Sequence, residues 1–281
     1  MVKKKSFSEE ELKDIVRYYL EDFETLSKIG EKFSVSKTVI SRVLKELGVE
    51  KRKNTTKKRQ NNRIFQHIDS HEKAYWLGFL YADGNVFFGK GNATISINLK
   101  RKDKEHLEKF LSFIGSNAEV TDYTNSNSHF KTICKPTEMS RVAIYSVEMA
   151  RDLTEKGCVP RKSLKAQRPL IPKEFYHSFA LGYFDGDGSI FQINDGKGYG
   201  FSILGTFELM TFFKDEVFSL EDTKIEKTIT ENNNYYIRCG GTIKPYEALK
   251  RIYLKELEGT CLQRKLSRFK KLETVVLHGN I

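Results

Sequence analysis

Several features are scarce in this sequence, and each scarcity excludes a class of protein. The four cysteines form no Cys-x-x-Cys pair, so their spacing gives neither a zinc site nor a disulfide framework. No apolar run reaches the length that spans a bilayer, and the basic N-terminus lacks the apolar stretch and cleavage site of a secretory signal. We therefore expect a protein of the reducing cytoplasmic interior, with no membrane partner and with reduced, buried cysteines. We also expect it to be a monomer.

Positive charge, in contrast, is abundant. The 281 residues carry a formal net charge of +11, and residues 1–69 alone hold 17 Lys or Arg against 11 Asp or Glu. A basic excess of this kind favours polyanions, above all nucleic acid, as partners. Hydrophobic residues make up 39% of the chain, which is typical of a globular protein with a core of its own.

Residues 1–50 have the periodicity of three short helices. Ser8 and Glu11 fit a capping box, Thr25 fits the N-cap of a second helix, and Gly48 stands where a left-handed cap ends a third. The second and third helices, joined by a short break at 34–36, make a helix-turn-helix pattern similar to that of resolvases and small regulators. The residues expected to face the major groove of DNA are Ser36, Lys37, Thr38, Ser41, Arg42 and Lys45.

The next segment, 51–69, is expected to be a basic linker. It starts with a run that has no apolar periodicity and therefore cannot pack a core. Such a run can follow a DNA backbone or enter a minor groove. The candidate contacts are Lys51, Arg52, Lys53, Lys57, Lys58 and Arg59.

The rest of the chain contains an internal repeat. Residues 75–86 and 179–190 share the pattern Leu-Gly-aromatic-apolar-x-small-Asp-Gly, and each is an apolar helix that ends at an acid followed by glycine. Strand and helix signals follow both segments in the same order. We expect repeats over 70–168 and 169–281, with the joint marked by Pro169 and Pro172.

The helix ends of the repeat are where chemistry is expected. Gly78 and Ala82, like Gly182 and Gly186, lie four apart on one helix face, so the two helices can pack closely and bring Asp83 and Asp187 together. Two acids at helix C-termini oppose the macrodipole and repel each other, so a bound cation is expected there. Hard oxygen ligands favour Mg²⁺ or Mn²⁺, and such a site suits hydrolysis of a phosphodiester bond.

The two motifs resemble the paired motifs of the LAGLIDADG homing endonucleases, in the single-chain form that carries both. The resemblance covers the chain from about Ser70 to the C-terminus. It implies a mixed α/β (α+β) fold of two pseudo-symmetric αββαββα units with antiparallel saddle sheets, here preceded by an all-α helix-turn-helix domain. It also implies that double-stranded DNA is the substrate.

The resemblance further implies roles for individual residues. Asp83 and Asp187 would be the essential acids, and the carbonyls of Ala82 and Gly186 would complete the metal shell. Lys162 and Lys265 match a basic residue near each centre, which could stabilise the transition state or orient water; contact with a phosphate, or plain solvent exposure, is the alternative. Arg101 matches a water-positioning residue, whose counterpart Gly205 has no side chain. The chain departs from the motif at Tyr81, where the family often has an acid and the second copy has Asp185.

The strands of the saddle would read the bases. Polar residues expected on the open faces are Thr94, Ser96, Asn98, Lys100, Lys131, Ser202 and Arg238, and Arg101 is a further candidate DNA contact.

We therefore expect a homing endonuclease that makes a staggered double-strand break at a long site. A DNA-binding regulator without cleavage, or an intron RNA maturase, on the same scaffold is the alternative. An intein is not indicated, because the chain neither begins with Cys or Ser nor ends in His-Asn.

Overall fold

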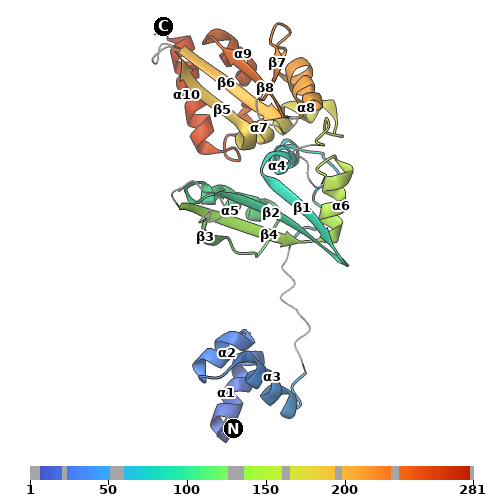
Figure 1. The fold of residues 1–281 in the computed structure, drawn as a ribbon, viewed down its shortest axis with the longest axis vertical. Helices are drawn as coiled ribbons and strands as arrows, with labels where there is room; N and C mark the ends of the chain where they lie inside the picture. The colour runs from blue at the N-terminus through green and yellow to red at the C-terminus, as the bar shows by residue number, and fades with distance from the viewer. Residues whose placement is uncertain are drawn as a thin grey trace. The chain divides into compact units, whose positions relative to one another are not determined.

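The structure is a computed structural model that describes residues 7–20, 24–50, 60–125, 136–159, 165–193, 198–228 and 234–278. These residues belong to two compact units, Met1–Lys57 and Lys58–Ile281, which are described one at a time (Figure 1). None of the described helices is long and apolar enough to cross a membrane.

The first unit contains three helices: α1 (Glu9–Leu20), α2 (Leu26–Lys32) and α3 (Lys37–Glu46). The capping box of α1 forms as expected, since the amide of Ser8 donates to Glu11 and the amide of Glu11 donates to the Ser8 hydroxyl at 3.1 Å. Thr25 caps α2, and Gly48 is left-handed at φ 71°. A small core gathers between the helices: Ile15, Tyr19, Ile29, Ile40, Val43 and Leu44.

The turn between α2 and α3 is tight. The amide of Val35 donates to the carbonyl of Gly30 at 2.8 Å, and a Cβ on Gly30 would overlap the carbonyl oxygen of Val35. This close approach packs the start of α3 against α2.

The second unit is built from two repeats that share the order of their main helices and strands up to α6 and α9. The first repeat runs α4 (His71–Ala82), β1 (Gly84–Gly89), β2 (Asn92–Lys100), the short helix η1 (Arg101–Asp103), α5 (Lys104–Phe113), β3 (Thr121–Asn125), β4 (Thr137–Tyr145) and α6 (Val147–Glu155). The second runs η3 (Lys173–Phe175), α7 (Tyr176–Asp187), β5 (Gly188–Ile193), β6 (Gly198–Gly205), α8 (Phe207–Phe212) with its π-helical continuation η5 (Phe213–Phe218), β7 (Ile225–Lys227), β8 (Tyr235–Gly240), α9 (Ile243–Lys250), η6 (Lys255–Leu257) and α10 (Gln263–Leu277). The αββαββα order that the resemblance implies is confirmed in both repeats, and α10 follows it in the second.

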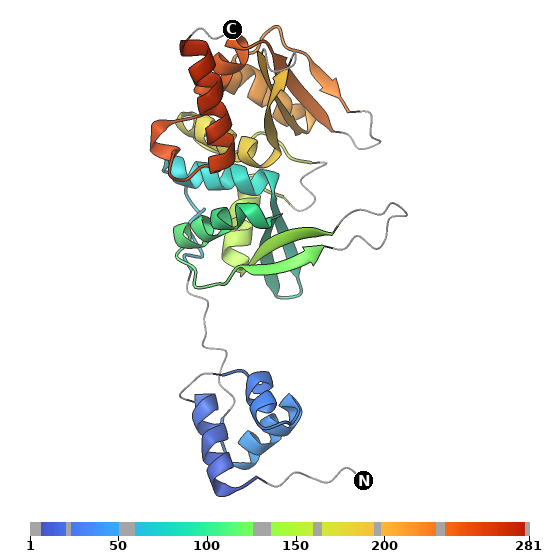
Figure 2. The ribbon, with the colours of Figure 1, turned by 90° about the vertical axis from the view of Figure 1, so that its left-hand side faces the viewer.

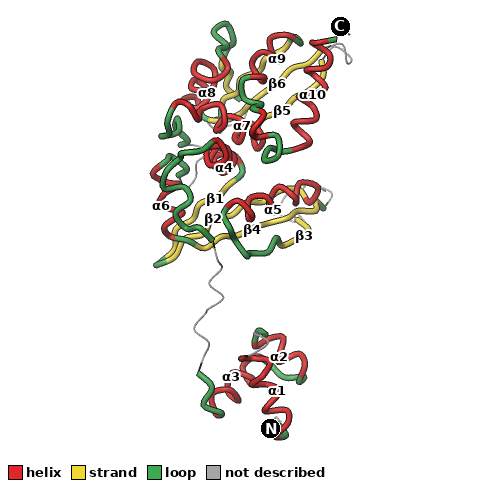
Figure 3. Tube along the Cα trace, turned by 180° about the vertical axis from the view of Figure 1, so that it is seen from behind, coloured by secondary structure: helices red, strands yellow, loops and turns green. Residues whose placement is uncertain are grey.

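Both sheets are antiparallel and have equivalent strand orders, β1-β2-β4-β3 and β5-β6-β8-β7. The helices of each repeat cover one face of its sheet, as the views from the side and from behind show (Figures 2 and 3). One continuous hydrophobic core fills the space between helices and sheets and includes the fully buried Trp76, Phe110, Phe179 and Phe213. No helix of the described residues covers the other face of either sheet, which is called the open face below.

Some of the expected boundaries are wrong. The linker predicted over 51–69 ends earlier, because Ile64, Phe65 and Ile68 are buried in the core of the second unit and Arg63 pairs with Asp152 at 2.9 Å. Residues 60–69 therefore belong to the second unit. The helix α9 ends at Lys250. The long helix α10, which the αββαββα order does not include, packs Leu266, Phe269 and Leu272 into the core.

Candidate functional site

Helices α4 and α7 pack against each other through their glycines. A Cβ on Gly78 would overlap the carbonyl oxygen of Phe179, and a Cβ on Gly182 would overlap that of Tyr75. The two contacts are equivalent, since each glycine lies against the carbonyl of the matching residue in the other repeat. Backbone-to-backbone packing of this kind needs glycine, as the spacing in the sequence indicates.

This packing brings the two motif acids toward one place. Asp83 follows the last residue of α4, and Asp187 is the last residue of α7. A Cβ built on Gly186 would lie 3.2 Å from Oδ2 of Asp83, so the carboxylate of the first repeat lies against the end of the second motif helix. Both acids also act on the buried hydroxyl of Tyr183: burial, Asp187 and Asp83 together raise the pKa of that hydroxyl well above its usual range.

A pocket of about 140 Å³ opens beside these helix ends. Asp187 and Ala82 line it together with both motif tyrosines, Tyr81 and Tyr183. Gly205 also lines it. The strand registers pair Gly84 with Ile97 and Gly188 with Ile203, so Gly205 corresponds to Leu99, and the expected equivalence of Gly205 with Arg101 is wrong because Arg101 corresponds to Phe207.

The donors at this place suit a hard divalent cation. Two carboxylates and the backbone carbonyls of Ala82 and Gly186 supply oxygen alone, which is the ligand chemistry of Mg²⁺ and Mn²⁺. Among the described residues no group of three or more His, Cys, Asp or Glu side chains is arranged to hold a metal ion. Carboxylates and main-chain oxygens would therefore have to share the coordination with water.

Lys265 lies at the same helix end, but it is enclosed. Its side chain is 3% exposed. The ammonium group donates to the carbonyls of Phe184 (2.6 Å), Asp185 (2.7 Å), Gly186 (3.2 Å) and Gly188 (2.6 Å). Burial lowers the pKa of Lys265 to about 8. The ammonium is thus in place to satisfy the orphan carbonyls at the C-terminus of α7, a contact that the sequence did not indicate.

Tyr81 and its counterpart Asp185 are both buried, but their side chains form different hydrogen bonds. Oδ2 of Asp185 accepts from the Tyr75 hydroxyl and from the amide of Leu262, both at 2.7 Å. Tyr81 instead donates to the carbonyl of Lys156 at 2.6 Å. Tyr81 therefore joins α4, as a donor, to the end of α6, and Asp185 joins α7, as an acceptor, to the residue that precedes α10.

The predicted base readers do share faces. In the first sheet Ser96 lies opposite Ala143, Asn98 opposite Arg141 and Lys100 opposite Met139, on the open face with Thr94. Ser96 is only 4% exposed, whereas Asn98 and Lys100 are exposed. In the second sheet Ser202 and Arg238 are directly opposite.

Some of the other predicted DNA contacts already have partners within the protein, and others lie outside the described residues. Arg101 pairs with Glu138 at 2.8 Å and is 3.9 Å from Asp122, so two carboxylates already balance its charge. On α3 the predicted residues are exposed, apart from the half-buried Ser41. The predicted residues outside the described part of the chain are Lys51, Arg52, Lys53, Lys57, Lys58, Arg59, Lys131 and Lys162.

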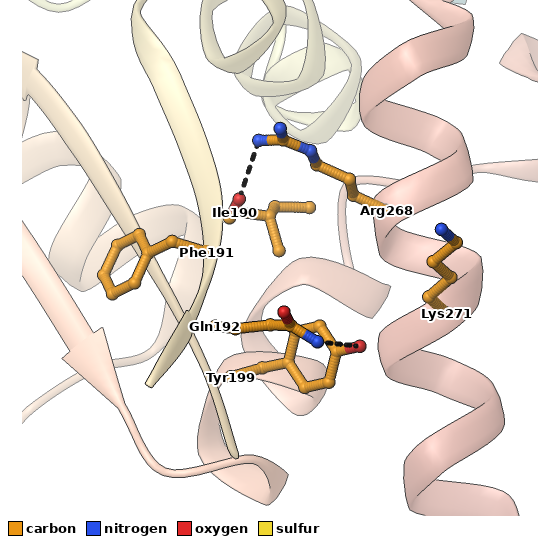
Figure 4. Close-up of a pocket in the computed structure, with 6 residues that line it drawn as sticks. All are labelled: Ile190, Phe191, Gln192, Tyr199, Arg268 and Lys271. Atoms are coloured by element: carbon orange, nitrogen blue, oxygen red, sulfur yellow. Dashed lines mark hydrogen bonds between the residues drawn. The ribbon is translucent and has the colours of Figure 1, made fainter. Parts of the chain in front are cut away.

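A second pocket contains basic residues that sequence reasoning missed. It measures about 320 Å³ and lies between the edge strand β5 and α10. Arg268 reaches across it to donate to the carbonyl of Ile190 at 3.0 Å, and Lys271 lines it one turn further along α10 (Figure 4). The i, i+3 spacing of these two residues was visible in the sequence, but it gained meaning only once α10 was known to flank β5.

Comparisons with known proteins give similarity at the level of solved structures alone. No known family profile and no curated protein matches the sequence. Among solved structures, the chain is similar to the LAGLIDADG homing endonuclease I-GzeII in complex with its DNA target, with a TM-score of 0.45, 12% identity and coverage of 74% of this chain and 92% of that one. It is also similar to I-SmaMI bound to uncleaved DNA with calcium ions (TM-score 0.46, 14% identity, 74% and 92% covered). A third is I-LtrWI, a LAGLIDADG homing endonuclease bound to target DNA (TM-score 0.45, 10% identity, 77% and 92% covered).

Proposed function

We propose that this chain is a metal-dependent DNA endonuclease of the LAGLIDADG homing type, which acts as a monomer and makes a staggered double-strand break at a long site. The observation that carries the proposal is the convergence of the two motif acids. Asp83 lies against Gly186 at the end of the opposite motif helix, and Asp187 is the next residue of that helix. Stability alone does not favour two acids at neighbouring helix C-termini.

A divalent cation fits this place and would supply the chemistry of the reaction. Mg²⁺ or Mn²⁺ held by Asp83, Asp187 and the carbonyls of Ala82 and Gly186 would polarise the phosphodiester group and lower the pKa of water. The chain's own residues position these ligands. The glycine contacts hold the helices together, and Lys265 holds the carbonyl end of α7. Lys265 acts in this proposal as a positioning residue, because its ammonium is already occupied by carbonyls. Lys162 is proposed as the basic residue of the first centre.

Duplex DNA would lie along the open faces of both sheets. Thr94, Asn98, Lys100, Ser202 and Arg238, which lie on strands β2, β6 and β8, would meet base edges in a major groove. Arg268 and Lys271 in the β5–α10 pocket would meet phosphates at the margin of that surface. The exposed basic residues of α3 would add a second DNA contact from the first unit, and the basic run at 51–59 would follow the backbone between them.

The experiment that tests the proposal is cleavage of a randomised duplex library by the purified chain, with Mg²⁺ and with EDTA, followed by sequencing of the ends. We expect metal-dependent cuts at one long site. Asp83→Asn and Asp187→Asn should each abolish double-strand cleavage while site binding persists. Asp222→Asn, which changes an exposed acid in the repeat that contains Asp187, serves as the control, and this variant should cut DNA normally. A variant at Asp83 or Asp187 that cuts both strands at the wild-type rate would exclude the assignment.

The alternative is a regulator or an intron RNA maturase on this scaffold, and the exposed basic residues of α3 in the first unit favour a regulator. Both alternatives predict binding without cleavage. Retention of specific DNA that is never cut, with Mg²⁺ or with Mn²⁺, would favour the regulator, and preferential binding of structured RNA would favour the maturase.

A further inference from the structure

The open face of the second sheet carries an arginine that is held in place by an aromatic ring. Arg238 on β8 places its guanidinium carbon 4.9 Å from the centre of the Phe191 ring on β5. The two residues lie on non-neighbouring strands, because β6 runs between them. The arginine side chain therefore crosses over β6 to reach the ring.

Glycines on β6 and β8 leave room for the arginine side chain to cross β6. Phe191 lies opposite Gly200, and Gly200 lies opposite Gly240, so the row next to Arg238 has only one side chain. A Cβ on Gly200 would come within 2.7 Å of Cε2 of Phe191. The ring thus lies over bare backbone of β6, where a larger residue would displace it. Figure 4 shows the ring on the side of β5 away from α10.

No carboxylate neutralises this arginine among the residues that the structure describes. Glu226, the acid on the adjacent strand, instead accepts a hydrogen bond from Tyr236. Arg101 in the first repeat provides the contrast, since Glu138 and Asp122 balance its charge. A guanidinium that is stacked, exposed and without a carboxylate keeps its planar fork of donors for another partner.

We infer that Arg238 reads a guanine in the major groove and that Phe191 is the positioning residue that holds its guanidinium. The inference rests on the proposed function, because it requires duplex DNA on the open face of this sheet. Guanine presents O6 and N7 as two acceptors in the major groove, and their spacing matches the arginine fork. The ring restricts the rotamers of the arginine before DNA arrives, so less conformational entropy is lost on binding.

The test is selection of bound duplexes from a randomised library in EDTA, so that binding is read without cleavage. The wild-type chain should enrich one site that contains a strongly preferred guanine. Arg238→Ala should lose the preference at that base pair alone, with affinity for the wild-type site reduced by roughly five- to 150-fold. Phe191→Leu keeps the apolar bulk but removes the flat ring, and it should relax the same position to a smaller extent. Arg101→Ala is the matched control and should leave this position unchanged.

The outcomes separate this inference from the function on which it rests. If the wild-type chain enriches no duplex, the proposed function fails and the inference fails with it. If the wild type enriches a site and Arg238→Ala enriches the same site with every preferred guanine intact, only the inference is overturned. A Phe191→Leu profile identical to that of the wild type, in a variant that melts normally, would remove the positioning role of the ring.

Discussion

The hydroxyl of Tyr75 on α4 donates to Oδ2 of Asp185 on α7 at 2.7 Å, so a buried polar contact joins the two central helices. The equivalent contact of the other half is apolar, since the ring of Phe179 meets that of Tyr81 edge-to-face with 4.9 Å between centroids. Tyr75 corresponds to Phe179 in the repeat, and Asp185 corresponds to Tyr81. The first repeat therefore has Tyr81 where the second has the acid Asp185, and the second repeat has Phe179 where the first has the hydroxyl of Tyr75. The two differences concern partners in the same contact.

Tyr75→Phe should destabilise the second unit more than Tyr81→Phe. The first change leaves the buried carboxylate with the amide of Leu262 as its remaining donor, while Oδ1 of Asp185 already has no partner among the described residues. Loss of a hydrogen bond to a buried charge costs about 1.5–3 kcal/mol. Tyr81→Phe removes a bond to the neutral carbonyl of Lys156 and should cost about 1 kcal/mol. Thermal unfolding of both variants measures the difference, and equal losses would contradict this account of the pair.

Much of this central pair could be predicted from the sequence, and the reason is local. The spacing of Gly78 from Asp83, and of Gly182 from Asp187, marks one face of each helix and the end of that helix. Both features depend only on the local sequence and not on how the helices pack. The polar pair could not be predicted, because it depends on which side chain of the other helix lies opposite Asp185. Strand β3 was expected only from the family resemblance, because all its residues are exposed and show no alternation of apolar and polar side chains. The role of Lys265 was missed because a lysine in a basic run reads as a surface residue.

Lys265→Met should destabilise the second unit strongly. It would leave the carbonyls at the end of α7 without their donor and Asp185 without the positive charge that compensates it. Removing one partner from a buried charged pair costs about 3–5 kcal/mol. Lys271→Met, an exposed lysine on the same helix, is the control and should leave the melting temperature nearly unchanged. A Lys265→Met protein that melts normally but fails to cut DNA would show that the ammonium acts on substrate instead.

His106 should make the second unit sensitive to mild acid. It is 3% exposed, and burial, followed by Lys109, Arg264 and Lys265, lowers the pKa of its imidazole to about 3. In the unfolded chain the imidazole of His106 binds a proton near pH 6.5, whereas in the folded chain it stays neutral until a much lower pH. Stability is therefore complete above that pH and falls as the pH decreases toward 3. Between pH 7.5 and 5 the loss should be about 2 kcal/mol.

His106→Gln tests this dependence. The amide nitrogen can still donate to the Tyr75 oxygen, which lies 3.1 Å from Nε2 in the wild type, but the side chain no longer titrates. Thermal melts of the variant across this pH range should be flatter than those of the wild type. His67→Asn, at an exposed position of the same unit, should keep the wild-type slope. Parallel curves for wild type and His106→Gln would refute the assignment.

The first unit should contribute to DNA affinity through phosphate contacts from α3. Arg42 is exposed on that helix, and a basic residue that neutralises one phosphate releases one condensed counterion. Arg42→Gln in the full chain should therefore weaken binding and reduce the slope of log K against log salt by about 1. Lys13→Gln makes the same charge change on the exposed side of α1 and should leave the slope unchanged. Titrations of a labelled duplex that contains the selected site, between 50 and 200 mM salt, measure both slopes. Equal slopes for all three proteins would mean that Arg42 does not neutralise a DNA phosphate, which would contradict the phosphate contact proposed for α3.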